Sequence, residues 1–296
     1  MSENNKKIRI GFHKICDCAN NHLNCSTAKE WMKSQVGVWE FYYEKRDIRD
    51  KELHPAVFPL ALAKKVINLF THKGELVLDP FNGAGTTLLA AKDLERNAVG
   101  FDINEDYCTL SRSRLGQEKL VSETKQITIC DDARNISDYF EPNTIKLVLT
   151  SPPYANLLNR PRLNKSRRGN ERKNKQYLKV EQYSQDPRDL GILDIEAYSK
   201  EMTEIYRGIF PLVGSGGHNV INVADMWWKG KSGRGRRVPI HIYIYRALTD
   251  AGFILKNTII WDRRNIVNRV GIFGWPSNYI TMGTTFEYIL DFWKPK

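Results

Sequence analysis

Apolar and polar positions follow two alternating patterns along most of the chain, and these patterns predict strands and helices in turn. Short, nearly all-apolar runs predict strands at 76–79, 98–102, 127–130, 146–151, 218–225, 253–262 and 285–294. Apolar residues at helical spacing predict helices at 59–71, 86–97, 105–120, 196–213 and 240–251. Apolar strands that alternate with helices are typical of a parallel sheet covered on both faces. We therefore predict an α/β fold with a doubly wound, mostly parallel sheet.

The two ends of the chain depart from this alternation. No long helix separates the last two predicted strands, so we expect an antiparallel strand at the C-terminal end of the sheet. Residues 1–50 are polar and aromatic and are interpreted as an N-terminal extension, which leaves 51–296 as the main domain. No apolar run approaches the ~18 residues of a membrane span, and the N-terminus lacks the apolar stretch of a signal peptide. We expect a cytoplasmic protein without a membrane partner.

The charge balance is strongly basic, with 45 lysines and arginines against 34 acids and a formal net charge of +11. Such an excess favours a polyanionic partner, and phosphate backbones are the commonest one. Basic residues gather in an insertion at 155–195 and in a loop at 229–237, although a charge run can also be a solvated face. The residues predicted to contact DNA are Arg160, Arg162, Lys165, Arg167, Arg168, Arg234, Arg236 and Arg237.

Five cysteines are too few for a disulfide scaffold. Cys16, Cys18 and Cys25 cluster with His13 and His22, which raises the question of a zinc site. Their spacing lacks a paired Cys-x-x-Cys, and no second half of a zinc motif follows downstream. We therefore expect ordinary thiols and no metal.

A glycine-containing turn follows the first predicted strand of the main domain, in the sequence DPFNGAGTT at 79–87. Glycines let the backbone approach a ligand and leave helix N–H groups free. The absence of G-x-G-x-x-G favours a ligand without phosphates over a dinucleotide. The next two strands end in Asp102 and in Asp131-Asp132, which suit ribose hydroxyls and an adenine amino group, although any of these acids could be a helix cap. An adenosine with a charged amino-acid tail fits this pattern.

A rigid loop of Ser151, Pro152, Pro153 and Tyr154 follows the fourth strand. Two prolines fix the backbone and remove two N–H donors, so the loop presents acceptors. The Ser151 hydroxyl and the Pro152 carbonyl could each accept one hydrogen of an NH2 group, and Tyr154 offers a face on which a base stacks. We predict that these four residues form the catalytic loop.

Together, DPFNGAGTT and TSPPY resemble the amino-methylating, site-specific DNA methyltransferases, which modify cytosine N4 or adenine N6. Residues 54–59 are similar to that family's additional cofactor-contacting motif, and the resemblance covers about 50–296. It implies the class I, Rossmann-like methyltransferase fold with S-adenosyl-L-methionine as cofactor. In particular, it implies Asp79 near the cofactor's amino group, Asp102 on the ribose and Asp132 on the adenine. The full implied cofactor set is His54, Pro55, Phe58, Asp79, Phe81, Gly83, Gly85, Thr86, Asp102 and Asp132.

Serine at the first loop position is associated in that family with cytosine N4, and aspartate or asparagine with adenine N6. We therefore expect a cytosine-N4 enzyme that flips its target base from double-stranded DNA and belongs to a restriction-modification system, with a cognate restriction endonuclease acting on the same site. The chain has no Pro-Cys dipeptide, which argues against covalent carbon-5 methylation. Adenine-N6 methylation, RNA or protein amide methylation and a non-catalytic nucleic-acid-binding relict remain alternatives.

Overall fold

The computed structural model describes residues 7–8, 13–19, 22–43, 58–116, 123–157, 186–229, 235–264 and 284–296. Within them, eight strands form one sheet in the order β1-β9-β10-β6-β5-β2-β3-β4. The strands of this sheet are β1 (Val38–Glu40), β2 (Leu76–Asp79), β3 (Asn97–Asp102), β4 (Gln126–Cys130), β5 (Ile145–Thr150), β6 (Val213–Val223), β9 (Ile254–Asp262) and β10 (Phe286–Trp293). A separate antiparallel pair consists of β7 (Met226–Lys229) and β8 (Gly235–Val238).

The predicted fold class is confirmed by the pairing of these strands. Strands β4, β3, β2, β5 and β6 are parallel neighbours, and β10 runs antiparallel to both β6 and β9. The order β4-β3-β2-β5-β6-β10-β9, with its single antiparallel strand, is the class I methyltransferase arrangement. The carboxyl ends of the parallel strands therefore meet at one edge, where open α/β sheets bind ligands.

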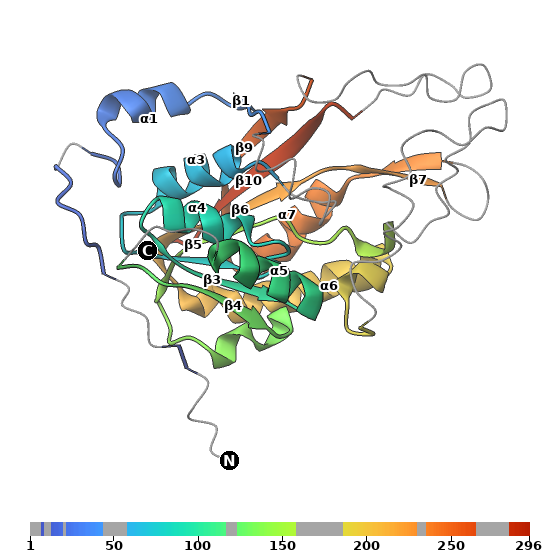
Figure 1. Ribbon diagram of the computed structural model, residues 1–296. Helices are drawn as coiled ribbons and strands as arrows, with labels where there is room; N and C mark the ends of the chain where they lie inside the picture. Colours follow the sequence, from blue (N-terminus) through green and yellow to red (C-terminus); the bar gives the residue numbers. More distant parts are fainter. Residues whose placement is uncertain are drawn as a thin grey trace, which may run out of the picture.

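Helices cover both faces of the sheet (Figure 1). The face with α3 (Leu60–Phe70) and α4 (Thr86–Asp93) packs around Val77 of β2, and the face with α6 (Ile195–Ile209) and α7 (Ile240–Asp250) packs around Leu76 and Leu78. Successive strand residues point to opposite faces, which is why an unbroken apolar run is required. Two further helices are α1 (Ala28–Ser34) and α5 (Glu105–Gly116).

Several regions differ from the sequence prediction. The helix expected at 86–97 ends at Asp93, and the ends of the loop expected at 229–237 belong to the strands β7 and β8. Residues 38–40 of the N-terminal extension form β1, which pairs in parallel with β9 at the edge of the sheet, and Trp39 is buried there. The helix expected at 196–213 ends at Ile209, because Pro211 has no N–H to continue it. Strand β6 then begins five residues before the predicted 218, in a glycine-rich stretch that weakened the apolar signal.

Candidate cofactor and catalytic site

Asp79 joins the two loops that the sequence singled out. Its side chain is buried at the end of β2, with a relative exposure of 2%. One carboxylate oxygen accepts hydrogen bonds from the Thr150 hydroxyl at 2.6 Å and the Phe81 N–H at 3.1 Å, and the other accepts from the Thr87 hydroxyl at 2.5 Å. Burial raises the pKa of Asp79 to about 6, against the effect of these hydrogen bonds. The residue before Ser151 is thus tied directly to the glycine turn and to α4.

The glycine turn packs closely against α5. Gly85 has a φ of +80°, which favours glycine, and a Cβ there would lie 2.3 Å from the Ser111 hydroxyl oxygen. Asn82 Nδ2 donates to the same hydroxyl at 3.0 Å. Arg114, also on α5, donates to the Ala84 carbonyl. Helix α4 begins directly after Gly85 without a side-chain cap, so its first N–H groups face the turn.

Asp102, at the end of β3, holds the middle of this turn. Its carboxylate accepts hydrogen bonds from the Gly83 N–H at 2.7 Å and the Asn104 N–H at 2.9 Å. Burial raises the pKa of Asp102 to about 6, and the charges of Asp79 and Asp189 add to the rise. Each carboxylate oxygen has a second lone pair, so Asp102 can accept further hydrogen bonds from a polar ligand.

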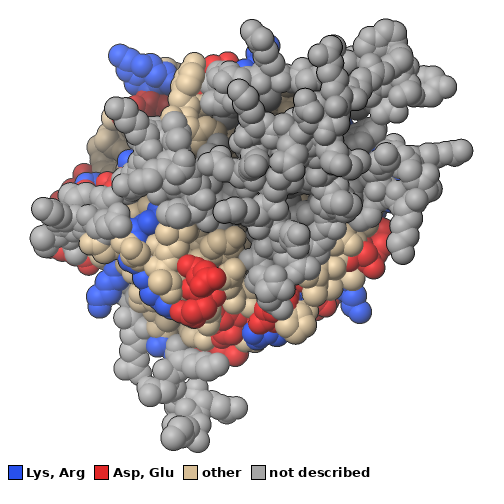
Figure 2. Space-filling model, turned by 45° about the vertical axis from the view of Figure 1, so that its right-hand side comes forward, with Lys and Arg blue, Asp and Glu red and all other residues tan. Residues whose placement is uncertain are grey.

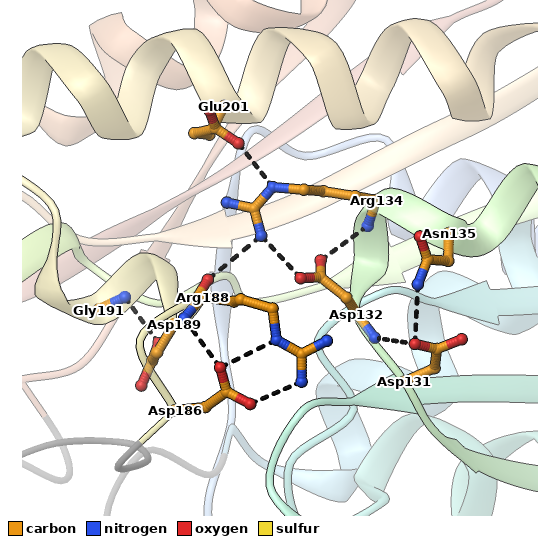
Figure 3. Close-up of polar contacts among 9 residues, drawn as sticks. All are labelled: Asp131, Asp132, Arg134, Asn135, Asp186, Arg188, Asp189, Gly191 and Glu201. Carbon is orange, nitrogen blue, oxygen red and sulfur yellow. Dashed lines mark hydrogen bonds and ion pairs between the residues drawn. The ribbon is translucent and has the colours of Figure 1, made fainter.

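Asp132 is a helix cap and an ion-pair partner in the structure (Figure 3). One oxygen accepts from the Arg134 N–H at 3.0 Å, and the other pairs with the Arg134 guanidinium at 2.8 Å. The guanidinium also donates to Glu201 of α6 at 2.6 Å and to the Arg188 carbonyl at 3.2 Å. The capping role that the sequence left open is therefore present, and contact between Asp132 and adenine stays a prediction.

The last part of the basic insertion, at 186–195, returns to this edge of the sheet, which the sequence did not predict. The backbone carbonyl of Arg188 accepts a hydrogen bond from the Arg134 guanidinium. The neighbouring Asp189 is 4% exposed, and its carboxylate accepts a hydrogen bond from the Gly191 N–H at 2.7 Å (Figure 3). Burial raises the pKa of Tyr107 on α5 to about 12, and the charges of Asp102 and Asp189 contribute to the rise. It follows that the side chains of Asp102, Tyr107 and Asp189 lie close enough to interact electrostatically. No motif in the sequence predicts that these three residues come together.

The predicted catalytic loop is anchored at both ends. Thr150 precedes it, and Ala155, which follows it, is fully buried with a left-handed φ of +47°. The Tyr154 hydroxyl accepts a hydrogen bond from the Ala224 N–H at 3.2 Å, just beyond β6. Ser151 and Tyr154 remain partly exposed, whereas Pro152 is buried. The loop therefore spans from the end of β5 to the end of β6 with its serine accessible.

An aspartate and a histidine stand beside this loop and were not predicted. Asp225 follows Ala224, and its carboxylate lies 2.6 Å from Nδ1 of His241 in the first turn of α7. The His241 ring stacks on Tyr288 with 4.0 Å between centroids. The sequence does contain a signal for Asp225. It is the acid that ends a predicted strand, in the sequence NVAD at 222–225, as Asp102 ends an earlier strand.

Other predicted residues divide into three groups. His54, Pro55, Arg160, Arg162, Lys165, Arg167, Arg168 and Arg234 lie outside the described residues. Phe58 and Thr86 are buried, and Phe81 is partly buried against the core. Arg236 is exposed on β8, while the neighbouring Arg237 donates to the Thr284 hydroxyl at 2.6 Å. On the face drawn in Figure 2, the described basic and acidic side chains are interspersed.

Comparison with known proteins gives partial matches. A family model described as DNA methylase matches residues 3–113, which include the glycine turn and Asp102. These residues are similar to the amino-methylating DNA methylases. The matched range ends before Ser151, so it carries no information on the target base. None of the helices in the described part of the chain is long and apolar enough to cross a membrane.

Curated relatives match over short stretches. The type II methyltransferase M.HindIII of Haemophilus influenzae is 49% identical over 70 residues, which cover 24% of this chain and 23% of that protein. M.ScaI of Streptomyces caespitosus is 36% identical over 103 residues, or 33% of each chain. The chain thus spans a quarter to a third of these relatives' length. A SAM-dependent methyltransferase from Methanosarcina mazei has a similar structure, with 12% identity, a TM-score of 0.48, and coverage of 78% of this chain and 97% of that one.

Proposed function

We propose that this chain is an S-adenosyl-L-methionine-dependent DNA methyltransferase that modifies the exocyclic N4 amino group of cytosine. The observation that carries the proposal is the Thr150–Asp79–Thr87 hydrogen-bond chain, which fixes the acceptor-rich loop beside the glycine turn. The similarity of residues 3–113 to a DNA methylase family supports the same activity. A biological role in a restriction-modification system is part of the proposal, because the relatives above are type II methyltransferases.

The residues at the glycine turn fit S-adenosyl-L-methionine. Gly83 and Gly85 leave room for close approach, the uncapped start of α4 presents N–H groups, and Asp102 offers acceptor lone pairs for hydroxyls. When bound, this cofactor supplies an electrophilic methyl group on a sulfonium. Protein donors occupy three of the four acceptor positions of the Asp79 carboxylate, so we assign Asp79 mainly to positioning the two loops.

The catalytic loop would bind and orient the target base. The Ser151 hydroxyl and the Pro152 carbonyl accept the two amino hydrogens, which directs the nitrogen lone pair towards the glycine turn. The Tyr154 ring supports the base, and its hydroxyl is held by Ala224. Catalysis then rests on positioning and electrostatics, since an amino group needs no covalent activation by the enzyme.

DNA binding is proposed for the basic residues that flank this edge. Of these, the described Arg236 lies on β8, paired with Trp228 of β7, and is exposed, so it can approach phosphate. Lysines at such positions would contact phosphates, and arginines could also read guanine. Because the target atom lies inside the duplex, the base must be flipped outward to reach Ser151.

Mass analysis of nucleosides tests this proposal. Duplex DNA of mixed sequence is incubated with the protein and isotopically labelled S-adenosyl-L-methionine, then digested. Labelled N4-methylcytosine is expected. N6-methyladenine would overturn the base assignment, and label in a parallel RNA sample but not in DNA would overturn the substrate. Saturable cofactor binding without any methylated nucleic acid would indicate the non-catalytic or protein-directed alternative.

A further inference from the structure

Three cysteines and one histidine converge at a place far from the catalytic loop. The side chains are Cys16, Cys18, Cys25 and His72, and one ligand atom from each lies within 4.8 Å of all the others. The three sulfurs are separated by 3.2, 3.5 and 3.6 Å. Nδ1 of His72 lies 3.5 Å from the Cys16 sulfur and 3.8 Å from the Cys25 sulfur. The cluster is thus a compact tetrad with one nitrogen and three sulfurs.

Most of these separations are close to those of a tetrahedral metal shell, and the 3.2 Å between the Cys16 and Cys18 sulfurs is the shortest. Zn–S bonds of ~2.3 Å at tetrahedral angles place sulfurs ~3.8 Å apart, and a Zn–N bond of ~2.0 Å places nitrogen ~3.5 Å from each sulfur. The observed distances between Cys16, Cys25 and His72 lie within a few tenths of an ångström of these values. They are much longer than the ~2.0 Å of a disulfide, so the thiols are not bonded to one another.

We propose that Cys16, Cys18, Cys25 and His72 bind one Zn²⁺ ion in a closed structural site. Cys3His is an established ligand set for structural zinc, and four protein ligands leave no open position for a substrate. Three soft thiolates and one imidazole favour zinc over magnesium, calcium or manganese, which prefer oxygen. A disulfide would pair two of the three thiols and leave both the third thiol and His72 without a role.

The turn that carries His72 is held in place by Arg96 and contacts Cys25. His72 directly follows Thr71, and the buried guanidinium of Arg96 donates to the Thr71 carbonyl at 2.8 Å and to its hydroxyl at 3.1 Å. The Lys73 N–H donates to the Cys25 sulfur at 3.3 Å. Backbone N–H bonds of this kind support ligating sulfurs in the shell around a metal, so the site has an outer shell already in place.

The cysteine segment is shaped to meet this turn. The Ile15 N–H donates to the Lys73 carbonyl at 3.0 Å, which brings Cys16 beside His72. Cys25 lies in a tight turn closed by two 2.9 Å backbone hydrogen bonds between Leu23 and Ser26, with Asn24 at a φ of +51°. Few apolar contacts hold residues 13–19, because most of their side chains are exposed. A metal would supply the stability that a hydrophobic core does not supply here.

The position of the site assigns it a structural task. His72 precedes β2, whose opposite end carries Asp79 and the glycine turn. The metal would therefore fasten the N-terminal segment to the amino end of the central strand, before the chain continues through α1 to β1 at the sheet edge (Figure 1). The sequence predicts no metal, because it has neither a paired Cys-x-x-Cys nor a second half of a zinc motif downstream. The structure instead places a single distant histidine beside the cysteines, whereas the sequence-adjacent His13 and His22 are not in the tetrad.

Metal content of the wild-type protein tests the proposal without relying on variants. Protein purified without chelator and passed over a desalting column is analysed by mass spectrometry for metals, and about one Zn²⁺ per chain is expected. Cobalt exchanged into the site should give the visible spectrum of tetrahedral Co²⁺ with thiolate charge-transfer bands. A chain that remains below ~0.1 zinc after refolding with excess zinc, or a Cys16–Cys18 or Cys16–Cys25 disulfide in protein prepared under reducing conditions, would overturn the proposal.

Variants identify the ligands. Cys25→Ser and His72→Asn should lose stoichiometric zinc, while Cys130→Ser and His13→Asn, matched controls outside the tetrad, should retain it. Alkylation of the native protein should spare the three ligand thiols until a chelator is added. Retention of full zinc by His72→Asn, or zinc loss from His13→Asn, would contradict the assignment. These readouts do not involve methyl transfer, so their outcome is separate from that of the proposed activity.

Discussion

Replacing Thr150 with valine isolates the link between the catalytic loop and the glycine turn. The side chain is fully buried, so valine fills the same space and only the 2.6 Å hydrogen bond to Asp79 is lost. A hydrogen bond to a charged group contributes about 1.5–3 kcal/mol, so the free energy of unfolding at pH 8 should fall by that amount. Turnover should fall as well, because Thr150 immediately precedes Ser151, while cofactor affinity changes little.

Thr87→Val is the matched control. It is also fully buried and loses a bond of 2.5 Å to the other oxygen of Asp79, but it lies on α4 rather than beside the catalytic loop. Its loss of stability should be similar and its loss of turnover smaller. Urea unfolding gives the free energies, and single-turnover methylation of duplex DNA gives the rates.

The pH dependence supplies a second check on the same variant. Burial raises the pKa of Asp79 to about 6, and the Thr150 bond opposes this rise, so its removal makes the ionised form still less favourable. When the pKa of a carboxyl group is higher in the folded than in the unfolded state, the free energy of unfolding falls as the pH rises from the unfolded-state pKa through the folded-state pKa. The decrease in the free energy of unfolding caused by Thr150→Val should therefore be larger at pH 8 than at pH 5. At pH 5 Asp79 is protonated, and the variant loses a hydrogen bond to an uncharged group, which contributes only about 0.5–1.5 kcal/mol. An equal loss at both pH values, or equal turnover in the two variants, would refute the reasoning.

Three further substitutions test individual roles. Gly85→Ala should destabilise the fold by about 1–3 kcal/mol in thermal unfolding, because its Cβ would meet Ser111, and it should weaken cofactor binding. Asp102→Ala should weaken cofactor affinity by calorimetry about 5- to 150-fold, the equivalent of ~1–3 kcal/mol of lost hydrogen bonding. Tyr154→Ala should lower methylation rates with cofactor affinity nearly unchanged, and Tyr154→Phe should retain more activity because it keeps the ring and loses only the Ala224 contact. A loss of cofactor affinity in Tyr154→Ala equal to that in Asp102→Ala would contradict the separate roles.

Much of the fold could be predicted because its central strands are buried on both faces. Residues 76–79 form β2 as predicted, and the strand ends at Asp102 and Thr150 differ from prediction by at most one residue. Strand β1 could not be predicted in the same way. It has three residues, and its burial depends on Trp261 and Phe41 rather than on any periodicity.

The parts of the site that could be predicted are those whose residues are consecutive in the sequence. The glycine turn and the Ser-Pro-Pro-Tyr loop are continuous motifs, and the hydrogen bonds of Asp79 bring them together. Asp189 and His241 escaped notice because each reaches the site by long-range folding, through neighbours distant in sequence. His72 joins the cysteines for the same reason, across 47 residues from Cys25.

A crystal structure with S-adenosylhomocysteine tests the central claim most directly. The account predicts the ligand's ribose at Asp102, its amino-acid end over Gly83 and Gly85, and its sulfur facing the Ser151 hydroxyl and the Pro152 carbonyl. A ligand bound elsewhere on the sheet, or a Ser151 hydroxyl directed away from the sulfur, would contradict it.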